Sequence, residues 1–507
     1  MKNLLVIGVG PHARRSHLPA LAAGQAAGLV GTICGVDVLG AANVVVAYDA
    51  DDGPRSVPVT LVEPFDSRER TLPDGVRRTL DDLVARRGID AVVVSTEPAY
   101  HVVYTRWALE RGLSVLLDKP LGVRTDASTD PRQASATLAD VDDLLVRYQA
   151  ARGRHPEILV SVQSQRRYHP AFWRMRQLIT EIAEETNCPV TSVQSFHSDG
   201  QWRLPDELLD LSYHGYDRGY GKCAHSGYHF FDIIPWLLAA GERSGKTSDT
   251  VKVHARVTRP TDLLAQLGVV DHERLFPGFA ARNPYSTQEL HTAARGFGEV
   301  DAFISMAFQS ADRTMTLGSL NLVHNGFSQR GNFAPATGLG LYKDNGRVRQ
   351  ETHIIQQGPF QALHFHSLQT LDDGRCTNDR YAAGGDGHVE VHVFRNSRFR
   401  PAWAAHTRLD HGALTSTWEG QVAHPTQQSS RRRSSQEFLD YLNGRRTREQ
   451  MRSELTSHRT AATLMAGAYL SMATQWTGGS SETTLSLGPT HTSVPSPARG
   501  PRADAAL

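Results

Sequence analysis

Short apolar runs alternate with helical patterns over the first third of the chain. Buried strands are predicted over residues 4–7, 43–49, 91–94, 114–117 and 158–162. Helices with one apolar face are predicted over the intervening residues 13–27, 79–87, 101–111 and 136–151. Strands that alternate with helices are typical of a doubly wound parallel sheet. The sequence therefore predicts an α/β domain over residues 1–168.

The pattern changes in the remainder of the chain. Apolar and polar residues alternate over residues 251–257 and 387–393. Such alternation indicates strands with one face toward water, usually in an antiparallel sheet. We expect a second, α+β domain over residues 169–477, with an open and mostly antiparallel sheet and closing helices over residues 434–472.

Two segments fit neither pattern. Residues 258–300 show little periodicity, and we expect a long loop or an insertion there. Residues 478–507 are rich in Gly, Ser, Thr and Pro, and we expect a disordered tail.

Length and composition agree with a two-domain enzyme. The chain has 507 residues, more than one hydrophobic core usually organises. Lys and Arg number 54 against 53 Asp and Glu, so no strongly charged surface for nucleic acid is indicated. The four cysteines form no C-x-x-C pair, and no apolar run is long enough for a signal peptide or a membrane span. We expect a cytoplasmic protein whose partner is a small molecule, with neither nucleic acid nor membrane as a partner.

A glycine-rich turn follows the first predicted strand. Gly8, Gly10 and Ala13 form a G-x-G-x-x-A element that also contains His12. Gly8 permits a tight turn, Gly10 lets the backbone approach a pyrophosphate, and Ala13 lets the helix pack closely on the strand. The helix N-terminus then offers N–H groups to phosphate oxygens. The element predicts a Rossmann domain that binds a dinucleotide; the alternative is a purely structural turn.

An acidic residue usually ends the second strand of such a site and binds the ribose hydroxyls. Asp49 follows the stronger apolar run, whereas Asp37 stands at a more usual distance from Gly8. We prefer Asp49 and interpret residues 30–42 as an insertion. An acid here favours NAD, because it would repel the 2′-phosphate of NADP. Arg14 and Arg15 keep NADP as an alternative.

Two further motifs carry a family resemblance. Thr96, Pro98 and His101 stand in a T-E-P-A-Y-H turn, which a helix connects to Asp118-Lys119-Pro120 after a strand. Residues 221–232 read G-K-C-A-H-S-G-Y-H-F-F-D. Together these motifs resemble the glucose–fructose oxidoreductase, inositol dehydrogenase and MocA family (Gfo/Idh/MocA). The likeness covers roughly residues 4–240 well and the remainder loosely.

The resemblance implies hydride transfer between a secondary alcohol and a nicotinamide cofactor. It implies that Lys119 and His229 are catalytic residues at the reacting oxygen. It also implies that the cofactor is surrounded by Thr96, Pro98, His101, Asp118 and Lys119. Histidine suits proton transfer near neutral pH, and an ammonium group stabilises a developing alkoxide. Arg167, Tyr228 and Asp232 are predicted to contact a substrate such as a sugar or cyclitol. Relatives often form homo-oligomers through the open sheet, so we expect one here.

One position departs from the family pattern. His225 stands four residues before His229, where the family has aspartate. An imidazole cannot stabilise a neighbouring imidazolium as a carboxylate does. His225 is a candidate third catalytic residue, but its usual proton relay is in question, and Asp232 is a candidate substitute.

Three other functions stay open. Bound NAD could assist elimination or hydrolysis of a glycoside, or the protein could bind NAD without catalysis. His225, His229 and His214 could also share a metal ion, although H-x-x-x-H spacing is common by chance among 23 histidines. We predict no metal site.

Overall fold

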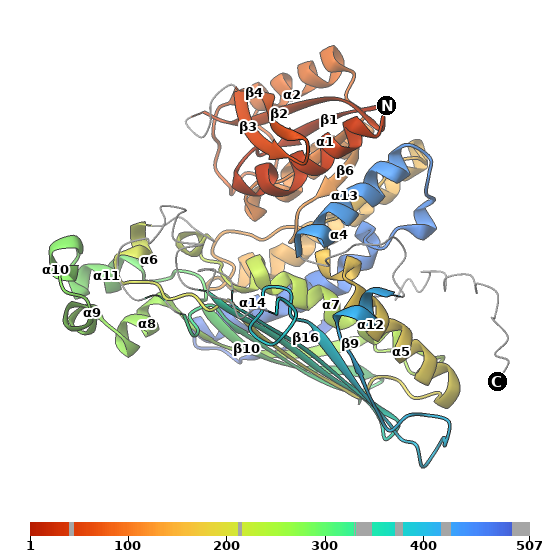
Figure 1. Ribbon diagram of the computed structural model, residues 1–507. Coiled ribbons are helices and arrows are strands. Elements are labelled where there is room, and N and C mark those ends of the chain that lie inside the picture. The colour runs from red at the N-terminus through yellow and green to blue at the C-terminus, as the bar shows by residue number, and fades with distance from the viewer. Residues whose placement is uncertain are drawn as a thin grey trace.

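A computed structural model describes residues 1–39, 45–210, 215–328, 330, 347–370, 379–416 and 427–488. Within these residues the chain forms a seven-stranded sheet and a nine-stranded sheet. Figure 1 shows the N-terminal α/β domain above the larger sheet, with helices α5, α7 and α14 between them. The predicted α/β and α+β classes of the two domains are confirmed.

The N-terminal sheet has the strand order β3-β4-β2-β1-β5-β6-β7. Strands β1, β2, β4, β5, β6 and β7 are parallel, and only the edge strand β3 is antiparallel. Their bounds are β1 Lys2–Ile7, β2 Val30–Val38, β3 Val45–Ala50, β4 Gly53–Val62, β5 Ala91–Val94, β6 Ser114–Leu117 and β7 Val160–Val162. Strands β5 and β6 are buried throughout, which explains their continuous apolar runs.

The predicted N-terminal helices are confirmed, with earlier starts for two of them. They are the π-helical turn η1 Ala13–His17, α1 Leu18–Ala26, α2 Asp74–Arg87, α3 His101–Glu110 and α4 Pro131–Arg154. Helix α4 begins at Pro131 because Asp130 caps it, its carboxylate accepting a hydrogen bond from the Arg132 amide. The apolar period alone does not show such a start.

The interpretation of residues 30–42 as an insertion is wrong. Val30–Val38 is the central strand β2, between β1 and β4. Its glycines made it look weak as a strand, but Gly35 is needed, since a Cβ there would lie 2.7 Å from the Val9 side chain. The stronger apolar run forms the edge strand β3, which pairs with β4 in a hairpin.

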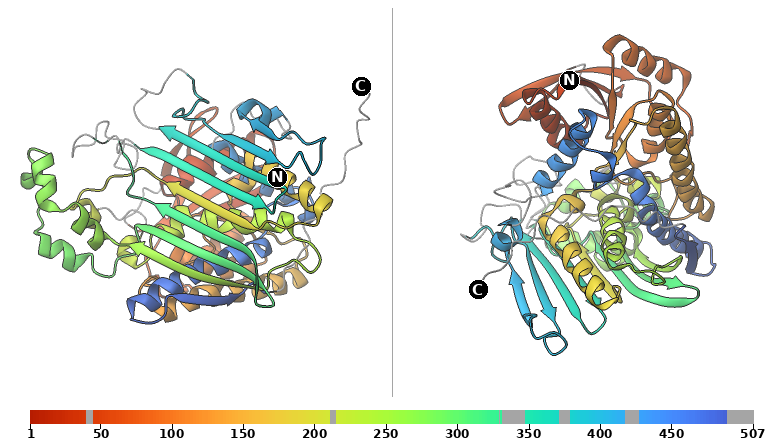
Figure 2. Two further views of the ribbon diagram at one scale, coloured as in Figure 1. Left: turned by 90° about the horizontal axis from the view of Figure 1, so that it is seen from below. Right: turned by 90° about the vertical axis from the view of Figure 1, so that its right-hand side faces the viewer.

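The second sheet has the strand order β15-β14-β13-β12-β8-β11-β10-β9-β16 and is mostly antiparallel. Its strands are β8 Ser192–Ser198, β9 Thr250–Thr258, β10 Asp301–Ser310, β11 Arg313–Val323, β12 Val348–Gln357, β13 Gln361–Thr370, β14 Glu390–Arg395, β15 His406–Leu409 and β16 Glu482–Ser486. Figure 2, left, looks onto the face of this sheet that the helices leave open. The opposite face packs against α5 Pro170–Thr186, α7 Tyr228–Leu238 and α14 Arg459–Trp476.

Two short helical elements lie near this sheet, the π-helical turn η5 Cys223–Gly227 and α12 His411–Ser416. The short helix α6, Glu207–Asp210, lies instead beside α10 and α11, and its Leu208 shares a hydrophobic cluster with them (Figure 1). The 3₁₀ turn η3, Gln165–Tyr168, leads from β7 into α5. It therefore connects the two domains.

Residues 258–300 are not one long loop. They contain α8 Pro260–Gln266, α9 Val269–Leu275, α10 Phe279–Arg282 and α11 Thr287–Ala293. These helices enclose a small core of their own, with Phe276, Phe279 and Leu290. Each helix is too short for an apolar period to be recognised, which is why the sequence suggested a loop.

The C-terminal segment also differs from expectation. Helix α13, Gln427–Leu442, packs against η1 and α1 of the N-terminal domain, and its buried residues Phe438 and Leu439 belong to the same hydrophobic cluster as Leu18 and Leu21 of α1. Strand β16 lies inside the expected disordered tail, because Glu482–Ser486 pairs with β9 at the sheet edge. Residues 489–507 lie outside the described part of the chain. Among the described residues, no helix is long and apolar enough to cross a membrane.

Candidate active site

The glycine-rich turn has the shape that a dinucleotide requires. Gly8 has a φ of +86°, and a Cβ there would lie 2.6 Å from the Ser95 carbonyl oxygen, so only glycine fits. A Cβ on Gly10, by contrast, would meet no protein atom within 4 Å. Ala13, the first residue of the helical turn η1, is fully buried. The open space above Gly10 fits a pyrophosphate, as predicted from the motif.

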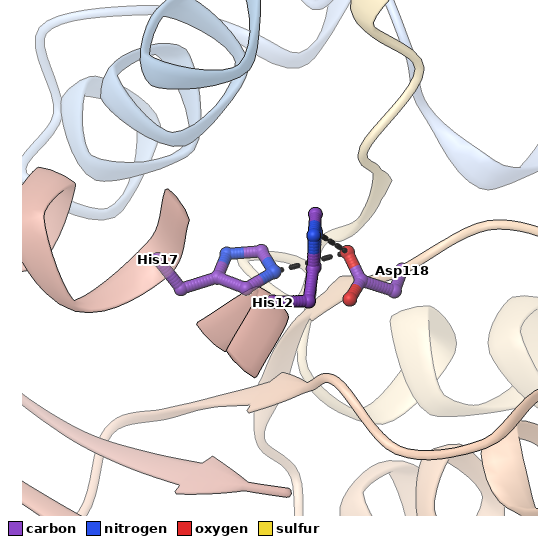
Figure 3. A group of neighbouring side chains, drawn as sticks. All are labelled: His12, His17 and Asp118. Atoms are coloured by element: carbon purple, nitrogen blue, oxygen red, sulfur yellow. Dashed lines mark hydrogen bonds and ion pairs between the residues drawn. The ribbon is translucent and has the colours of Figure 1, made fainter. Parts of the chain in front are cut away.

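A cluster of three side chains fixes this turn to the end of β6. Figure 3 shows His12 and His17 directed toward the carboxylate of Asp118. His17 Nε2 lies 2.9 Å and His12 Nε2 3.5 Å from Asp118 Oδ1. Burial alone would raise the pKa of Asp118, but the two histidines hold it well below its usual range. Burial also lowers the pKa of His12, so we assign an ionised Asp118 and a neutral His12.

The same three residues have the donor types of a Zn²⁺ site, and their ligand atoms lie within 4.8 Å of one another. Hydrogen bonds nevertheless account for the group. Ser95 donates to Asp118 Oδ2 at 2.7 Å, and Gln163 Oε1 lies 3.2 Å from His12 Nε2. We therefore assign the cluster to positioning of the glycine-rich turn.

His101 lies inside the protein, not on a cofactor surface. Its Nδ1 lies 2.7 Å from the Pro120 carbonyl oxygen and its Nε2 3.0 Å from that of Thr96. Only 1% of the residue is exposed. His101 therefore connects the turn that contains Thr96 and Pro98 with the turn that follows Lys119, and we correct its predicted role from binding to positioning.

Lys119 connects the two domains at the carboxyl end of β6. Its Nζ donates a hydrogen bond of 2.5 Å to the backbone carbonyl oxygen of His225 in η5. The Lys119–Pro120 peptide bond is cis. The contact involves the backbone of His225, so it does not require a histidine at that position. The contact places the end of the D-K-P motif against the 221–232 segment.

His229 is the second residue of α7 and lies in its first turn. The charge of Lys119 influences its imidazole. The residue is 6% exposed, and its Nδ1 has no hydrogen-bond partner among the described residues. Burial, the strongest influence, and the charges of Lys119, Arg166 and Arg431 hold the pKa of His229 well below 6.5. The imidazole is therefore neutral near pH 7 and can accept a proton.

His225 and His229 do not share one α-helix. His225 lies in the π-helical turn η5, whereas His229 lies in α7. The expected i, i+4 relationship of an α-helix therefore does not apply to this pair. His214, the third histidine of the metal alternative, lies outside the described residues.

Arg167, Tyr228 and Asp232 belong to a buried network and not to a substrate surface. Arg167 Nη2 lies 2.5 Å from Asp232 Oδ1, and His458 Nδ1 lies 3.1 Å from the same oxygen. Tyr228 Oη lies 3.3 Å from His458 Nδ1. All four residues are at most 1% exposed. Their predicted role in substrate binding is therefore corrected, and Asp232 is engaged too fully to replace the missing aspartate of the relay.

An Asp232→Asn variant should lose roughly 3–5 kcal/mol of unfolding free energy, because the Arg167 charge would stay buried without its counterion. Urea denaturation followed by circular dichroism measures this loss. Asp52→Asn is the control: that residue forms an exposed ion pair with Arg55, so its substitution should change the unfolding free energy little. Equal stability of the two variants would contradict a structural role for Asp232.

The acid at the second parallel strand is Asp37, not Asp49. Asp37 Oδ2 accepts a hydrogen bond of 3.1 Å from the Val9 amide in the glycine-rich turn. Asp49 is exposed on the edge strand β3, where it pairs with Pro54. The preference for Asp49 is therefore corrected: it followed from taking β3 as the second strand of the parallel sheet. We propose Asp37 as the ribose-binding acid.

Asp37→Ala should weaken NAD binding roughly ten- to a hundredfold, because a charge-assisted hydrogen bond contributes about 1.5–3 kcal/mol. NADP should be weakened less, since the variant no longer repels its phosphate. Fluorescence titration with NADH and NADPH measures both affinities. Asp49→Ala is the matched control and should bind both cofactors as the wild type does. If the preference for NADH over NADPH changed in Asp49→Ala and not in Asp37→Ala, Asp49 would be the ribose-binding acid, as the sequence predicted.

A parallel sheet with this turn at the carboxyl end of β1 defines a dinucleotide-binding domain. Residues 2–143 match the family model GFO_IDH_MocA, described as "Oxidoreductase family, NAD-binding Rossmann fold". This match covers the N-terminal domain and less than half of the chain, and it makes that domain similar to the NAD-binding Rossmann domains of this oxidoreductase family. The resemblance and the NAD cofactor predicted from the motifs are confirmed.

Solved structures share the fold of the whole chain. An oxidoreductase domain protein from Kribbella flavida is 14% identical, with a TM-score of 0.53, over 96% of this chain and 100% of its own. A levoglucosan dehydrogenase in complex with NADH and levoglucosan is 13% identical, with a TM-score of 0.50, over 96% of this chain and 99% of its own. At these identities the likeness concerns the fold alone. No curated protein matches the sequence significantly.

Proposed function

We propose that the protein interconverts a secondary alcohol and a ketone on a sugar, cyclitol or related small polar molecule. The observation that carries the proposal is the hydrogen bond from Lys119 to η5, the turn that leads directly into α7 and His229. Lys119 follows strand β6 of the NAD-binding domain, and its Nζ donates a hydrogen bond to the His225 carbonyl oxygen in η5. The charge of Lys119 also lowers the pKa of His229, in the first turn of α7. Ligands of open parallel sheets bind at the carboxyl ends of the strands, where Lys119 stands.

The roles of the two residues follow from their charges. NAD, when bound, accepts the hydride from the carbinol carbon. Neutral His229 accepts the hydroxyl proton, and the Lys119 ammonium group stabilises the oxygen while it carries negative charge. In the reducing direction His229 returns the proton. The sugar or cyclitol class comes from the family resemblance, and the fold shared with a levoglucosan dehydrogenase is compatible with it.

The experiment is an assay of purified protein with NAD and a panel of sugars and cyclitols, read as NADH absorbance. Net NADH formation on one of these alcohols supports the proposal. Turnover of a glycoside with no net NADH would favour NAD-assisted elimination or hydrolysis, and NAD binding with no turnover would favour a regulatory protein.

The pH profile gives a second test. Because burial and nearby cations depress the pKa of His229, the acidic limb of kcat/KM for alcohol oxidation should lie below pH 6.5. Arg431→Gln removes one of those cations and should move the limb upward. Arg408→Gln, on the exposed strand β15, should leave it in place. A limb above 6.5 that does not respond to Arg431 would assign the proton transfer to another group.

We also propose a cytoplasmic homo-oligomer. Phe303 and Leu317 are 52% and 60% exposed on β10 and β11, and the sheet face seen in Figure 2, left, is open to a second copy. The described cysteines, Cys34, Cys188 and Cys223, are free, which suits a reducing compartment. Light scattering on the eluting protein tests the oligomer, and a monomer at micromolar concentration would contradict it.

A further inference from the structure

A cavity of about 240 Å³ lies on the inner face of the second sheet. Strands β12 and β13 form its floor, and η3, the first turn of α5 and the first turn of α13 surround it. Its volume is slightly below the range of pockets for drug-sized ligands, so it suits one small molecule. The sequence analysis did not identify this cavity, because its lining comes from five separate parts of the chain.

The lining carries an excess of positive charge. Three arginines contribute to it, Arg166, Arg349 and Arg431, against the two carboxylates of Glu351 and Asp386. Both carboxylates already have cationic partners. Glu351 accepts two hydrogen bonds from Arg166, at 2.7 and 2.5 Å, and Asp386 lies 2.8 Å from Arg380 outside the cavity. Among the described lining residues the arginines therefore outnumber the carboxylates, and a bound anion would meet three guanidinium groups.

Several buried polar atoms in the lining have no hydrogen-bond partner among the described residues, and two of them bear on the choice of ligand. They are Nη1 of Arg166, which can only donate, and Oε1 of Gln165, which can only accept. The two residues are 5% and 4% exposed. Burying such groups without a hydrogen-bond partner is unfavourable. A ligand with an anionic oxygen and a hydroxyl group would satisfy both.

The cavity is electrostatically coupled to the candidate catalytic base. Arg166 and Arg431, which line it, both lower the pKa of His229, and Glu351, also in the lining, raises it. Arg166 also lies over the ring of Phe230, the neighbour of His229, at 4.3 Å from the ring centre. The cavity is therefore lined by Arg166, which contacts the residue next to His229, and we take it as the part of the substrate site remote from the reacting oxygen.

We propose that the substrate is a small acidic polyol, with a carboxylate or phosphate group held in this cavity by Arg166, Arg349 and Arg431. The inference rests on the proposed function for the identity of the site, and it adds the charge of the substrate. The Arg166–Glu351 pair fixes the guanidinium group in the lining, so that little conformational entropy is lost when an anion binds.

Binding is tested without turnover, by calorimetry on protein saturated with NADH. The probes are matched pairs: gluconate against sorbitol, glucuronate against glucose, and glucose 6-phosphate against glucose. We expect the charged member of at least one pair to bind at least tenfold more tightly. The first two pairs test a carboxylate and the third a phosphate. Added NaCl should reduce the difference.

Arg349→Gln should remove most of that preference, and Arg349→Lys should retain part of it because the charge remains. Arg408→Gln, on the exposed strand β15 beside Glu390, is the matched control and should bind the probes as the wild type does. NADH affinity should be unchanged in all three variants, which separates this cavity from the cofactor site. Charged probes that bind no better than their neutral partners, or not at all, would overturn the proposal, as would a preference that survives in Arg349→Gln.

Failure of the proposed function gives a different result. If the charged probes bind through Arg349 but no alcohol on the panel reduces NAD, the anion site stands and the reaction is wrong. If a neutral polyol is oxidised through His229 and the charged probes bind no better, the reaction stands and the anion site is wrong.

Discussion

Replacing His229 by alanine should lower kcat/KM for alcohol oxidation by roughly 10²–10⁴-fold, the usual contribution of a positioned general base. The imidazole is buried and kept neutral by Lys119, Arg166 and Arg431, so it is ready to take the hydroxyl proton near pH 7. Stopped-flow measurement of NADH formation gives the loss, and fluorescence titration should show unchanged NADH affinity.

The matched control is His225→Ala. Lys119 contacts the backbone carbonyl oxygen of residue 225, and alanine retains that oxygen. We therefore expect a much smaller effect, even though His225 occupies the position where the family has aspartate. A His229→Ala enzyme with full activity and an unmoved pH profile would show that His229 is a structural residue. A larger loss in His225→Ala than in His229→Ala would return the proton transfer to residue 225.

Local sequence signals were sufficient for much of the NAD-binding domain. The residues of β5 and β6 were predicted as the structure has them, because strands buried on both faces give continuous apolar runs. The Gly8 and Gly10 turn was recognised because its steric requirements are local. The second strand was misassigned for the opposite reason: Gly35 is required by Val9, a contact that only the fold creates.

The candidate site was predictable only where a motif marks it. Arg166 and Arg167 are adjacent in η3, yet Arg166 lines the cavity and Arg167 pairs with buried Asp232. No periodic pattern distinguishes two neighbours in so short a turn. Arg349 and Arg431 come from β12 and α13, and only tertiary packing brings them to Arg166. The substrate pocket could therefore not be assembled from the sequence.

The domain contact at Lys119 explains why the motifs occur far apart in the sequence. Helix α14 packs on α4 of the NAD-binding domain and on α7 of the second domain, so the two domains share one continuous core. This packing sets the end of β6 against η5. The catalytic arrangement therefore depends on a fixed domain interface, with Lys119 from one side and His229 from the other.

A Lys119→Met variant should lose about 10²–10³-fold in kcat, the usual effect of removing one group that stabilises an oxyanion. Methionine keeps an unbranched, apolar side chain of similar length, so the folded core should be preserved, which thermal unfolding checks. The loss should appear in kcat more than in NADH affinity, because the ammonium group acts on the charge that develops on the substrate oxygen.

The pH profile of Lys119→Met should also change in a way that a purely structural role of Lys119 would not produce. Lys119 is one of the cations that lower the pKa of His229. Its removal should therefore move the acidic limb of the residual kcat/KM toward higher pH, since the imidazolium form becomes easier to reach. In a Lys119→Ala variant, which leaves the space of the side chain empty, a small amine such as ethylammonium added to the assay should restore part of the rate. Lys2→Met, which removes an exposed lysine paired with Asp90, is the control and should change neither rate nor profile. If Lys119→Met retained its rate, or lost it with an unmoved limb and with no rescue of Lys119→Ala by amine, the ammonium group would be holding the domain interface and not the reacting oxygen.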